Sequence, residues 1–200
     1  MQHCKPKVFF IGFNKTATTS FHYYFQRNRF TSYHYTLTKD LPYPKNCLAY
    51  YIQQNVIANN SILNGIEDAC VYSDMCYLDK NNILFEGNKF FVKMHEENPD
   101  AYFVLQIRNV EDWIRSRLNH QNGKFANVIC KGLNTNKKLL REIWREEYFK
   151  HLESVRYFFR SSNNFLKFDI DVDKIDKLND FLRNDYTLNN KYWKKLNASK

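Results

Sequence analysis

The sequence is poor in glycine and proline, with 5 and 4 of them among 200 residues, and nowhere do they gather with serine into a flexible stretch. Linkers between domains and low-complexity tracts are rich in these residues, so neither is expected here. An internal repeat is missing as well. We therefore expect residues 1–200 to form one domain, which is enough chain for a single α/β core.

Cysteine is present but without the patterns that give it a structural role. The five cysteines are odd in number and form no Cys-x-x-Cys pair. A disulfide framework usually needs an even set, and zinc sites usually contain closely spaced pairs. We expect free, buried thiols and no bound metal.

Long apolar runs are also missing. No run approaches the roughly 20 residues that a helix needs to cross a bilayer, and the chain enters its first predicted strand without a charged and then apolar leader. We therefore expect a soluble, cytoplasmic protein without a membrane span.

What is present is an ordinary globular composition with a basic excess. Apolar residues make up 44%, and aromatic residues, at 17%, are frequent enough for Phe and Tyr to dominate the core. The formal charge of +9 suits a polyanionic partner, which can be nucleic acid, an acidic polysaccharide or an anionic cofactor. The basic residues are dispersed, apart from Lys137, Lys138 and residues 191–200, so we expect no nucleic-acid partner.

Short apolar runs alternate with longer amphipathic stretches along the chain, a pattern that predicts strands and helices in turn. We expect strands at residues 8–12, 70–72, 102–107 and 165–168. We expect helices at residues 19–27, 46–59, 83–97, 110–120, 137–160 and 173–183. This order is typical of an α/β fold whose central parallel sheet is covered by helices on both faces.

Three local features complete the expected fold. Residues 31–45, with Pro42 and Pro44, predict a loop over the carboxyl edge of the sheet. Asp173 is expected to cap the last helix, because aspartate is favoured at that position. Trp113 occupies an apolar position of its helix and is expected in the core.

An apolar strand leads directly into a lysine, four hydroxyl side chains and an amphipathic helix in the segment FFIGFNKTATTS, residues 9–20. The start of a helix leaves backbone N–H groups without partners, and the helix dipole adds positive potential there. Phosphate and sulfate bind well at such a place. The segment therefore predicts an anion-binding loop for the terminal groups of a nucleotide. Lys15 supplies a full charge, and the hydroxyls available as donors are those of Thr16, Thr18, Thr19 and Ser20.

The loop departs from that of nucleoside triphosphatases. A Walker loop has Gly-x-x-x-x-Gly-Lys followed by Ser or Thr, whereas here Lys15 follows Gly12 by three residues and no second glycine precedes it. The acids that follow predicted strands, and that could hold magnesium, are Asp74 and Asp169. An ATPase or kinase would therefore lack its usual metal arrangement.

The order Gly-x-x-Lys-Thr-x-Thr-Thr-Ser resembles the 5′-phosphosulfate loop of the sulfotransferase family, whose donor is 3′-phosphoadenosine 5′-phosphosulfate. A second landmark of that family is a strand that ends in arginine, with a serine eight positions later on the next helix. Residues 102–116, YFVLQIRNVEDWIRS, resemble it in residue type and spacing, with Arg108 and Ser116 at those places. The end of the chain, with KLNDFL at residues 177–182, is also similar, while residues 31–60 match least.

The resemblance implies a three-layer fold like that of P-loop NTPases and a sulfotransferase that moves a sulfuryl group to a hydroxyl or amine of an acceptor, either a glycan or a small metabolite. It implies that Lys15 stabilises the leaving oxygen, that the loop holds the 5′-phosphate, that Arg108 and Ser116 hold the 3′-phosphate, and that no metal is needed. The family usually has glycine where Ala17 stands. The donor-binding residues implied in this way are Asn14, Lys15, Thr16, Ala17, Thr18, Thr19, Ser20, Arg108 and Ser116.

A hydroxyl acceptor also needs a general base within hydrogen-bonding reach. We favour Asp74, because the strand predicted at residues 70–72 should end at the same crevice. The alternatives are His34, His95 and His120. Near the carboxyl end, Lys195, Asn197 and Lys200 either help to bind the donor nucleotide or form a frayed basic tail.

Two other functions stay open at this point. One is a nucleotide kinase or NTPase with a related loop, and the other is a non-catalytic module that binds anions or polysaccharides on the same fold. Arg108 has a structural alternative too, since it could pair with the nearby acid Glu111.

Overall fold

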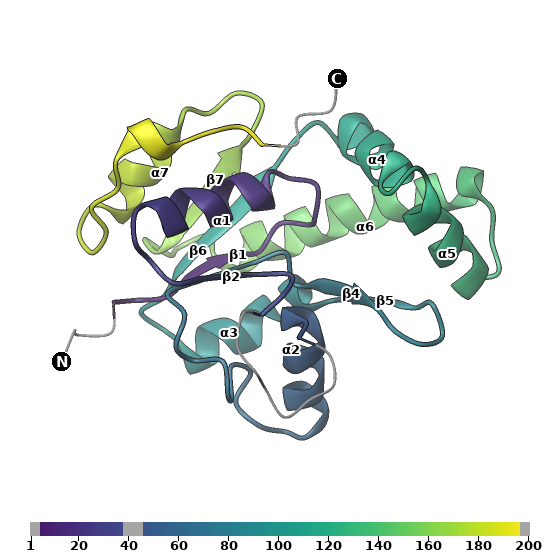
Figure 1. The fold of residues 1–200 in the computed structure, drawn as a ribbon, viewed down its shortest axis with the longest axis horizontal. Coiled ribbons are helices and arrows are strands. Elements are labelled where there is room, and N and C mark those ends of the chain that lie inside the picture. Colours follow the sequence, from purple (N-terminus) through teal and green to yellow (C-terminus); the bar gives the residue numbers. More distant parts are fainter. Residues whose placement is uncertain (1–4, 38–45, 197–200) are drawn as a thin grey trace.

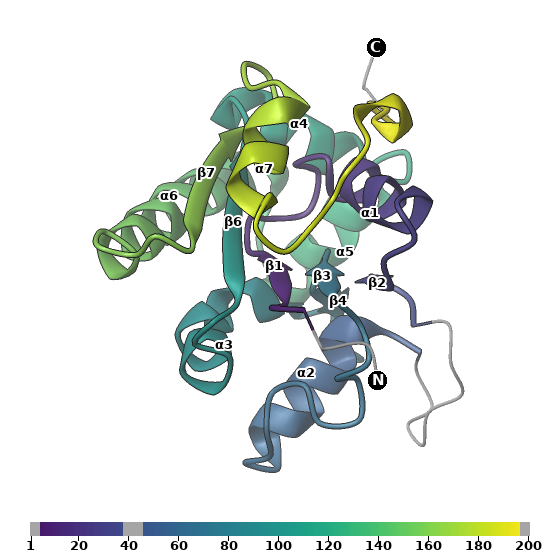
Figure 2. The ribbon, with the colours of Figure 1, turned by 90° about the vertical axis from the view of Figure 1, so that its left-hand side faces the viewer.

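The computed structural model describes residues 5–37 and 46–196. At its centre lies a five-stranded sheet in the order β2-β3-β1-β6-β7, in which every neighbouring pair is parallel (Figure 2). The strands are β1 Val8–Phe10, β2 Ser32–His34, β3 Val71–Ser73, β6 Tyr102–Ile107 and β7 Phe165–Asp169. An α/β fold with a central parallel sheet is confirmed.

Helices cover both faces of this sheet (Figure 1). The α-helices are α1 Thr18–Arg27, α2 Leu48–Ile57, α3 Phe91–Glu97, α4 Val110–Asn119, α5 Lys124–Gly132, α6 Lys137–Phe158 and α7 Ile175–Leu182. Helices α1 and α7 pack on one face, whereas α2, α3 and the end of α6 pack on the other. The result is a sheet between two helical layers, as the sequence pattern predicted. None of the helices in the described ranges is both long enough and apolar enough to pass through a bilayer.

Strand β1 illustrates why these residues form a buried parallel strand. Phe9 and Phe10 are both fully buried, and because side chains alternate along a strand they face opposite layers. Phe9 stacks between Tyr72 and Phe103 from the neighbouring strands, with ring centroids 5.3 Å away in each case. Phe10 stacks on Phe21 of α1 at 4.6 Å. The core is therefore largely aromatic, as the composition indicated.

The structure contradicts several of the predicted elements. The helix expected at residues 83–97 is only partly present: β5 Leu84–Glu86 pairs with β4 Cys76–Leu78 in an antiparallel hairpin, and the 3₁₀ helix η1 Gly87–Phe90 precedes α3. The loop expected at residues 31–45 contains strand β2, and its residues 38–45 lie outside the described ranges. Helix α5 was not predicted. Each missed strand has three residues, too few to show a periodic pattern.

Two smaller predictions also change. The N-cap position of α7 is occupied by Lys174, not Asp173, and the Lys174 side chain makes no capping hydrogen bond. The Asp173 carboxylate instead accepts a hydrogen bond from the Asp169 N–H and pairs with Lys177 at 2.7 Å. The cysteines were expected to be buried, but among the described ones only Cys76 is, and Cys47, Cys70 and Cys130 are partly exposed.

A third apolar cluster joins α4, α5 and the start of α6 beside the sheet. Arg117 of α4 lies inside it with no exposed surface, between the rings of Trp113 and Trp144 at 4.7 and 4.6 Å. Its Nη2 donates to the buried carboxylate of Glu86 at 2.8 Å, so an ion pair links α4 to the hairpin. Lys89 pairs with the other carboxylate oxygen at 2.9 Å. These two cations keep the pKa of Glu86 below its ordinary value despite burial.

Gly12 marks the point where the chain leaves β1 and passes very close to β6. A Cβ atom at this position would lie 2.2 Å from the Gln106 carbonyl oxygen, and the Gly12 N–H donates to Gln106 Oε1 at 2.9 Å. Since the obstacle is backbone, a side chain cannot be accommodated by a change of rotamer. Glycine is therefore required for close approach of the two strands.

We expect Gly12→Ala to lower the free energy of unfolding by about 3 kcal/mol or more, because the added methyl group forces β1 away from β6. Gly65→Ala is the matched control: Gly65 also has a restrictive backbone, with φ of +80°, but open space around it, and it should lose only about 1 kcal/mol. Urea unfolding measures both. Equal losses in the two variants would contradict the close approach.

Candidate functional site

The candidate site lies at the carboxyl edge of the sheet, where the chain leaves four neighbouring strands. Strand β1 lies between β3 and β6, and all strands of this sheet run in the same direction, so their carboxyl ends lie at one edge of the sheet. In open α/β sheets ligands bind at such a place. The residues brought there are Lys15 after β1, His34 at the end of β2, Asp74 after β3 and Arg108 after β6.

The loop after β1 turns sharply and leads into α1, whose amino-terminal end has no side-chain cap. Lys15 and Ala17 both have left-handed backbones, with φ of 68° and 62°. Ala17 is the N-cap of α1, and no side chain caps the first turn. The first N–H groups of α1 and its positive dipole end are therefore free to meet an anion.

Two cations from different elements meet at this loop. Arg108 Nη1 lies 3.4 Å from the Lys15 carbonyl oxygen, to which it donates. The hydroxyl of Tyr148 accepts from the Arg108 N–H at 3.2 Å and donates to its carbonyl at 2.7 Å, which fixes the end of β6. Arg108 does not pair with Glu111, because that carboxylate accepts from Arg145 at 2.7 Å. The expected alternative of an Arg108–Glu111 ion pair is therefore absent from the described residues.

The burial of Lys15 and the nearby positive charge of Arg108 both disfavour the charged form of Lys15, and a bound anion would offset this effect. Burial is the main cause that lowers the pKa of Lys15, and the positive charge of Arg108 acts in the same direction, opposed by Asp74. Among the described residues, the buried Nε of Arg108 has no hydrogen-bond partner. A buried donor without a partner costs roughly 1–3 kcal/mol, so a bound anion that accepts from it would be strongly favoured.

The loop hydroxyls have different environments. Thr16, which is fully buried, donates to the Phe13 carbonyl, and Ser20 Oγ accepts from the Leu196 N–H at 2.9 Å. Thr18 Oγ1 lies 3.5 Å from Asp74 Oδ2, to which it donates. Thr19 is half-buried in the first turn of α1. Three of the four hydroxyls therefore already bond to other parts of the protein, which leaves the backbone N–H groups as the main candidate donors to an anion at this loop.

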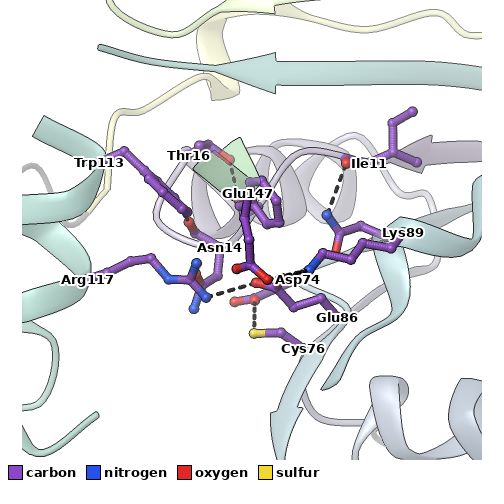
Figure 3. Close-up of polar contacts among 12 residues, drawn as sticks. Ile11, Asn14, Thr16, Asp74, Cys76, Glu86, Lys89, Trp113, Arg117 and Glu147 are labelled. Atoms are coloured by element: carbon purple, nitrogen blue, oxygen red, sulfur yellow. Dashed lines mark hydrogen bonds and ion pairs between the residues drawn. The ribbon is translucent and has the colours of Figure 1, made fainter. Parts of the chain in front are cut away.

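Asp74 and His34 form a contact pair at the neighbouring ends of β3 and β2. The Asp74 carboxylate lies 3.3 Å from His34 Nε2 and accepts from Cys76 Sγ at 3.3 Å (Figure 3). Burial lowers the pKa of His34, while Asp74 acts against this shift. A neutral His34 that donates from Nε2 orients the carboxylate. Sequence reasoning did not find Cys76, because a lone cysteine carries no pattern.

A second, unpredicted histidine supports this pair. The rings of His22 and His34 stack with centroids 5.0 Å apart, and His22 Nδ1 lies 2.9 Å from Ser32 Oγ. Burial, together with the nearby His34, lowers the pKa of His22 to about 4. Both imidazoles are therefore neutral at physiological pH.

The other two candidate bases, His120 and His95, lie in different parts of the molecule. His120, at the end of α4, places Nδ1 3.4 Å from Lys15 Nζ, and burial and then Lys15 lower its pKa. His95 packs among the rings of Phe103, Phe158 and Phe159 in the core, with centroid distances of 5.4–5.8 Å. The site therefore contains His34 and His120 but not His95.

The wall beside the loop is formed by α4. Trp113 Nε1 donates to the Asn14 carbonyl at 2.9 Å, which fixes the loop to this helix (Figure 3). In the described part of the chain, the buried Oδ1 of Asn14 has no hydrogen-bond partner. Ser116 lies half-buried two turns into α4, which also begins beside Arg108. The burial of Trp113 is as predicted, but its polar contact to the loop was not.

The last described residues pass over α1. The Trp193 ring packs against Phe21 with centroids 5.1 Å apart, and Lys195 Nζ donates to the Ile170 carbonyl at 3.0 Å. Asn197 and Lys200 lie outside the described residues. Lys195 is thus bound to a backbone carbonyl of the domain. This contact does not test its role in donor binding, which stays a prediction.

Within residues 5–37 and 46–196, no three His, Cys, Asp or Glu side chains gather closely enough to hold a metal ion. No known protein-family model matches the sequence, and no curated protein is significantly similar to it. The assignment of the site therefore depends on its own geometry and on the motif resemblance.

Substitutions of Ala17 test the left-handed backbone conformation at this position of the loop. Ala17→Gly should change the free energy of unfolding by no more than about 1 kcal/mol, because relief of strain is offset by the greater freedom of glycine in the unfolded chain. Ala17→Val should lose about 2 kcal/mol, since a β-branched side chain fits poorly at φ of 62°. Urea unfolding of the three proteins is the measurement, and equal stability of the valine variant would contradict this backbone conformation.

His22 predicts a loss of stability in mild acid. Since its pKa is lowered to about 4, the unfolded chain binds more protons than the folded one between that pH and about 6.5, and stability rises with pH across this window. Between pH 7 and pH 5 this one group should cost about 2 kcal/mol. His22→Asn keeps a polar group beside Ser32 and should lose correspondingly less over the same range. An unchanged pH dependence would show that His22 is not held neutral.

Proposed function

We propose that this protein is a sulfotransferase that uses 3′-phosphoadenosine 5′-phosphosulfate as donor. The observation that carries the proposal is the contact between the two predicted anion grips. Arg108 and Lys15 come from separate strand ends. The Arg108 guanidinium donates to the Lys15 backbone carbonyl at 3.4 Å, its charge acts on the Lys15 ammonium, and its buried Nε has no partner among the described residues. One small molecule with a negative group at each end can touch both. The P-loop-like sulfotransferase architecture is the finer form of the α/β fold that goes with this proposal.

In this proposal the donor lies across the crest of the sheet. The free N–H groups at the start of α1 and the Lys15 ammonium would bind the 5′-phosphosulfate, as in other helix N-terminal anion sites. Arg108 would bind the 3′-phosphate through its planar guanidinium, with Ser116 of α4 as a second donor. The loop residues Asn14, Thr16, Ala17, Thr18, Thr19 and Ser20 would give this cradle its shape.

The proposed chemistry is an in-line transfer. An acceptor oxygen attacks the sulfur atom, the bond from sulfur to the bridging oxygen breaks, and adenosine 3′,5′-bisphosphate leaves with the bonding electrons. Negative charge grows on the bridging oxygen, where Lys15 stabilises it. The proton of the acceptor hydroxyl passes to the Asp74 carboxylate as general base.

Two neighbours assist this assignment of roles. His34 lies 3.3 Å from Asp74 and orients the carboxylate, and His120 lies 3.4 Å from Lys15 Nζ and can accept a hydrogen bond from it. Because burial, and then the positive charge of Lys15, lower the pKa of His120, this imidazole is neutral and leaves the ammonium charged. The proposed base and leaving-group stabiliser thus come from two neighbouring strand ends, Asp74 after β3 and Lys15 after β1.

Calorimetry with adenosine 3′,5′-bisphosphate tests the donor site. Arg108→Ala should raise the dissociation constant about 30-fold or more, because it removes a buried cation from a charged hydrogen bond. Arg115→Ala is the matched control, since Arg115 lies on the exposed side of α4 and pairs with Asp112 at 2.7 Å; it should bind as the wild type does. Lys15→Ala should reduce transfer of labelled sulfate to a panel of hydroxyl and amine acceptors by a factor of about 100 to 1,000.

Three outcomes would overturn the proposal. Tight, magnesium-dependent ATP binding without affinity for the bisphosphate would indicate a kinase or NTPase. Full bisphosphate affinity without turnover on any acceptor would indicate a non-catalytic binding module. Equal effects of Arg108→Ala and Arg115→Ala would place the donor elsewhere.

A further inference from the structure

One segment beside the site carries charge of a single sign. From Trp113 to Arg141 the sequence has seven lysines and arginines and no aspartate or glutamate. In a chain with 30 basic and 21 acidic residues, a stretch of this length without an acid is unusual. It covers most of α4, all of α5 and the start of α6.

The fold sorts these seven residues into three groups. Arg117 is buried against Glu86, and Arg115 pairs with Asp112 of the same helix. The remaining five are exposed, and we call them the basic surface: Lys124, Lys131, Lys137, Lys138 and Arg141.

The basic surface is continuous across two helices. Lys124 and Lys131 are seven residues apart and therefore lie on the same side of α5. Lys137 Nζ lies 3.8 Å from the place where a Cβ of Gly123 would be, so the first turn of α6 sits next to the start of α5. Helices α4, α5 and α6 are held together by one apolar cluster. The lysines of both helix starts thus share one surface.

This surface begins next to the proposed reaction centre. The Gly123 N–H donates to the His120 carbonyl at 3.1 Å, which closes a turn between α4 and α5. The ring of the same His120 lies 3.4 Å from Lys15 Nζ. A chain molecule bound along the basic surface would therefore reach the crevice at Lys15 and Asp74.

We propose that the acceptor is a polyanionic polysaccharide, bound by this basic surface with one of its hydroxyls delivered to Asp74. The inference rests on the proposed sulfotransferase function. Clustered lysines bind carboxylate- or sulfate-bearing polymers through charge, and a sugar supplies the hydroxyl that the transfer requires. Nucleic acid fits less well. Proteins that hold single strands stack bases on exposed rings, whereas both aromatic residues of the segment, Trp113 and Phe125, are buried.

The test measures polymer binding without any donor. The surface variant is Lys124→Glu with Lys137→Glu and Lys138→Glu. Since these residues lie in the first turns of α5 and α6, glutamate there is favoured by the helix dipole and should preserve the fold. The control is Lys150→Glu with Arg156→Glu and Arg183→Glu, exposed positions elsewhere with the same change in charge.

Heparin and polygalacturonate serve as sulfated and carboxylated probes, and dextran as the neutral one. We expect binding of both anionic polymers and not of dextran, with an affinity loss of about tenfold or more in the surface variant relative to the control. Bisphosphate binding should be the same in wild type and both variants. An equal loss in the two variants, no binding of either polymer, or tighter binding of duplex DNA would each overturn the proposal.

The two proposals fail separately in this design. A chain that binds bisphosphate but neither polymer keeps its proposed enzymatic class and loses the polysaccharide acceptor. A chain that binds both polymers through the basic surface but not bisphosphate loses the sulfotransferase function and becomes a polysaccharide-binding module.

Discussion

The site depends on one constraint: the loop after β1 is held against β6 and α4 by three backbone contacts. The Gly12 N–H meets the side chain of Gln106, the Asn14 carbonyl accepts from Trp113, and the Lys15 carbonyl accepts from Arg108. Consecutive parts of the loop are thus fixed from outside it, which is why Lys15 and Ala17 can keep left-handed backbones that cost about 1 kcal/mol or more each. Without this support the loop would relax, and its N–H groups would no longer point at one place.

The buried ion pair of Arg117 and Glu86 extends this support to the far side of the site. Desolvation of two charges is expensive, and such a pair is weak evidence for net stability. Its geometry, however, fixes where α4 lies relative to the hairpin, because the guanidinium is enclosed by Trp113 and Trp144 and has only one carboxylate partner among the described residues. Helix α4 carries Ser116 and is followed directly by His120. The Arg117–Glu86 ion pair therefore helps to fix the position of both residues.

Strong local signals in the sequence predicted the fold class and the elements that converge at the site. Two near-continuous apolar strands and a turn with one lysine and several hydroxyl residues were sufficient to place Lys15 and Arg108 at one edge of a parallel sheet. What the sequence could not reveal depends on contacts between distant residues. Strand β2 is recognisable only through its pairing with β3, and His22 reaches His34 only because α1 and β2 are neighbours in space. The hydroxyls of Thr16 and Ser20 look like ligand donors in the sequence, and their actual partners, Phe13 and Leu196, follow only from the folded chain.

The path of the final segment over α1 has a practical consequence. Of the three tryptophans, Trp113 and Trp144 are buried in the apolar cluster around α4, whereas Trp193 is partly exposed and packs at a tilt against Phe21, one turn beyond the start of α1. A shift of the α1 start would change the polarity around this single indole far more than around the other two. The chain thus contains an intrinsic fluorophore next to the loop proposed to bind the donor, and the proposed occupancy of that loop can be followed by emission without any attached dye.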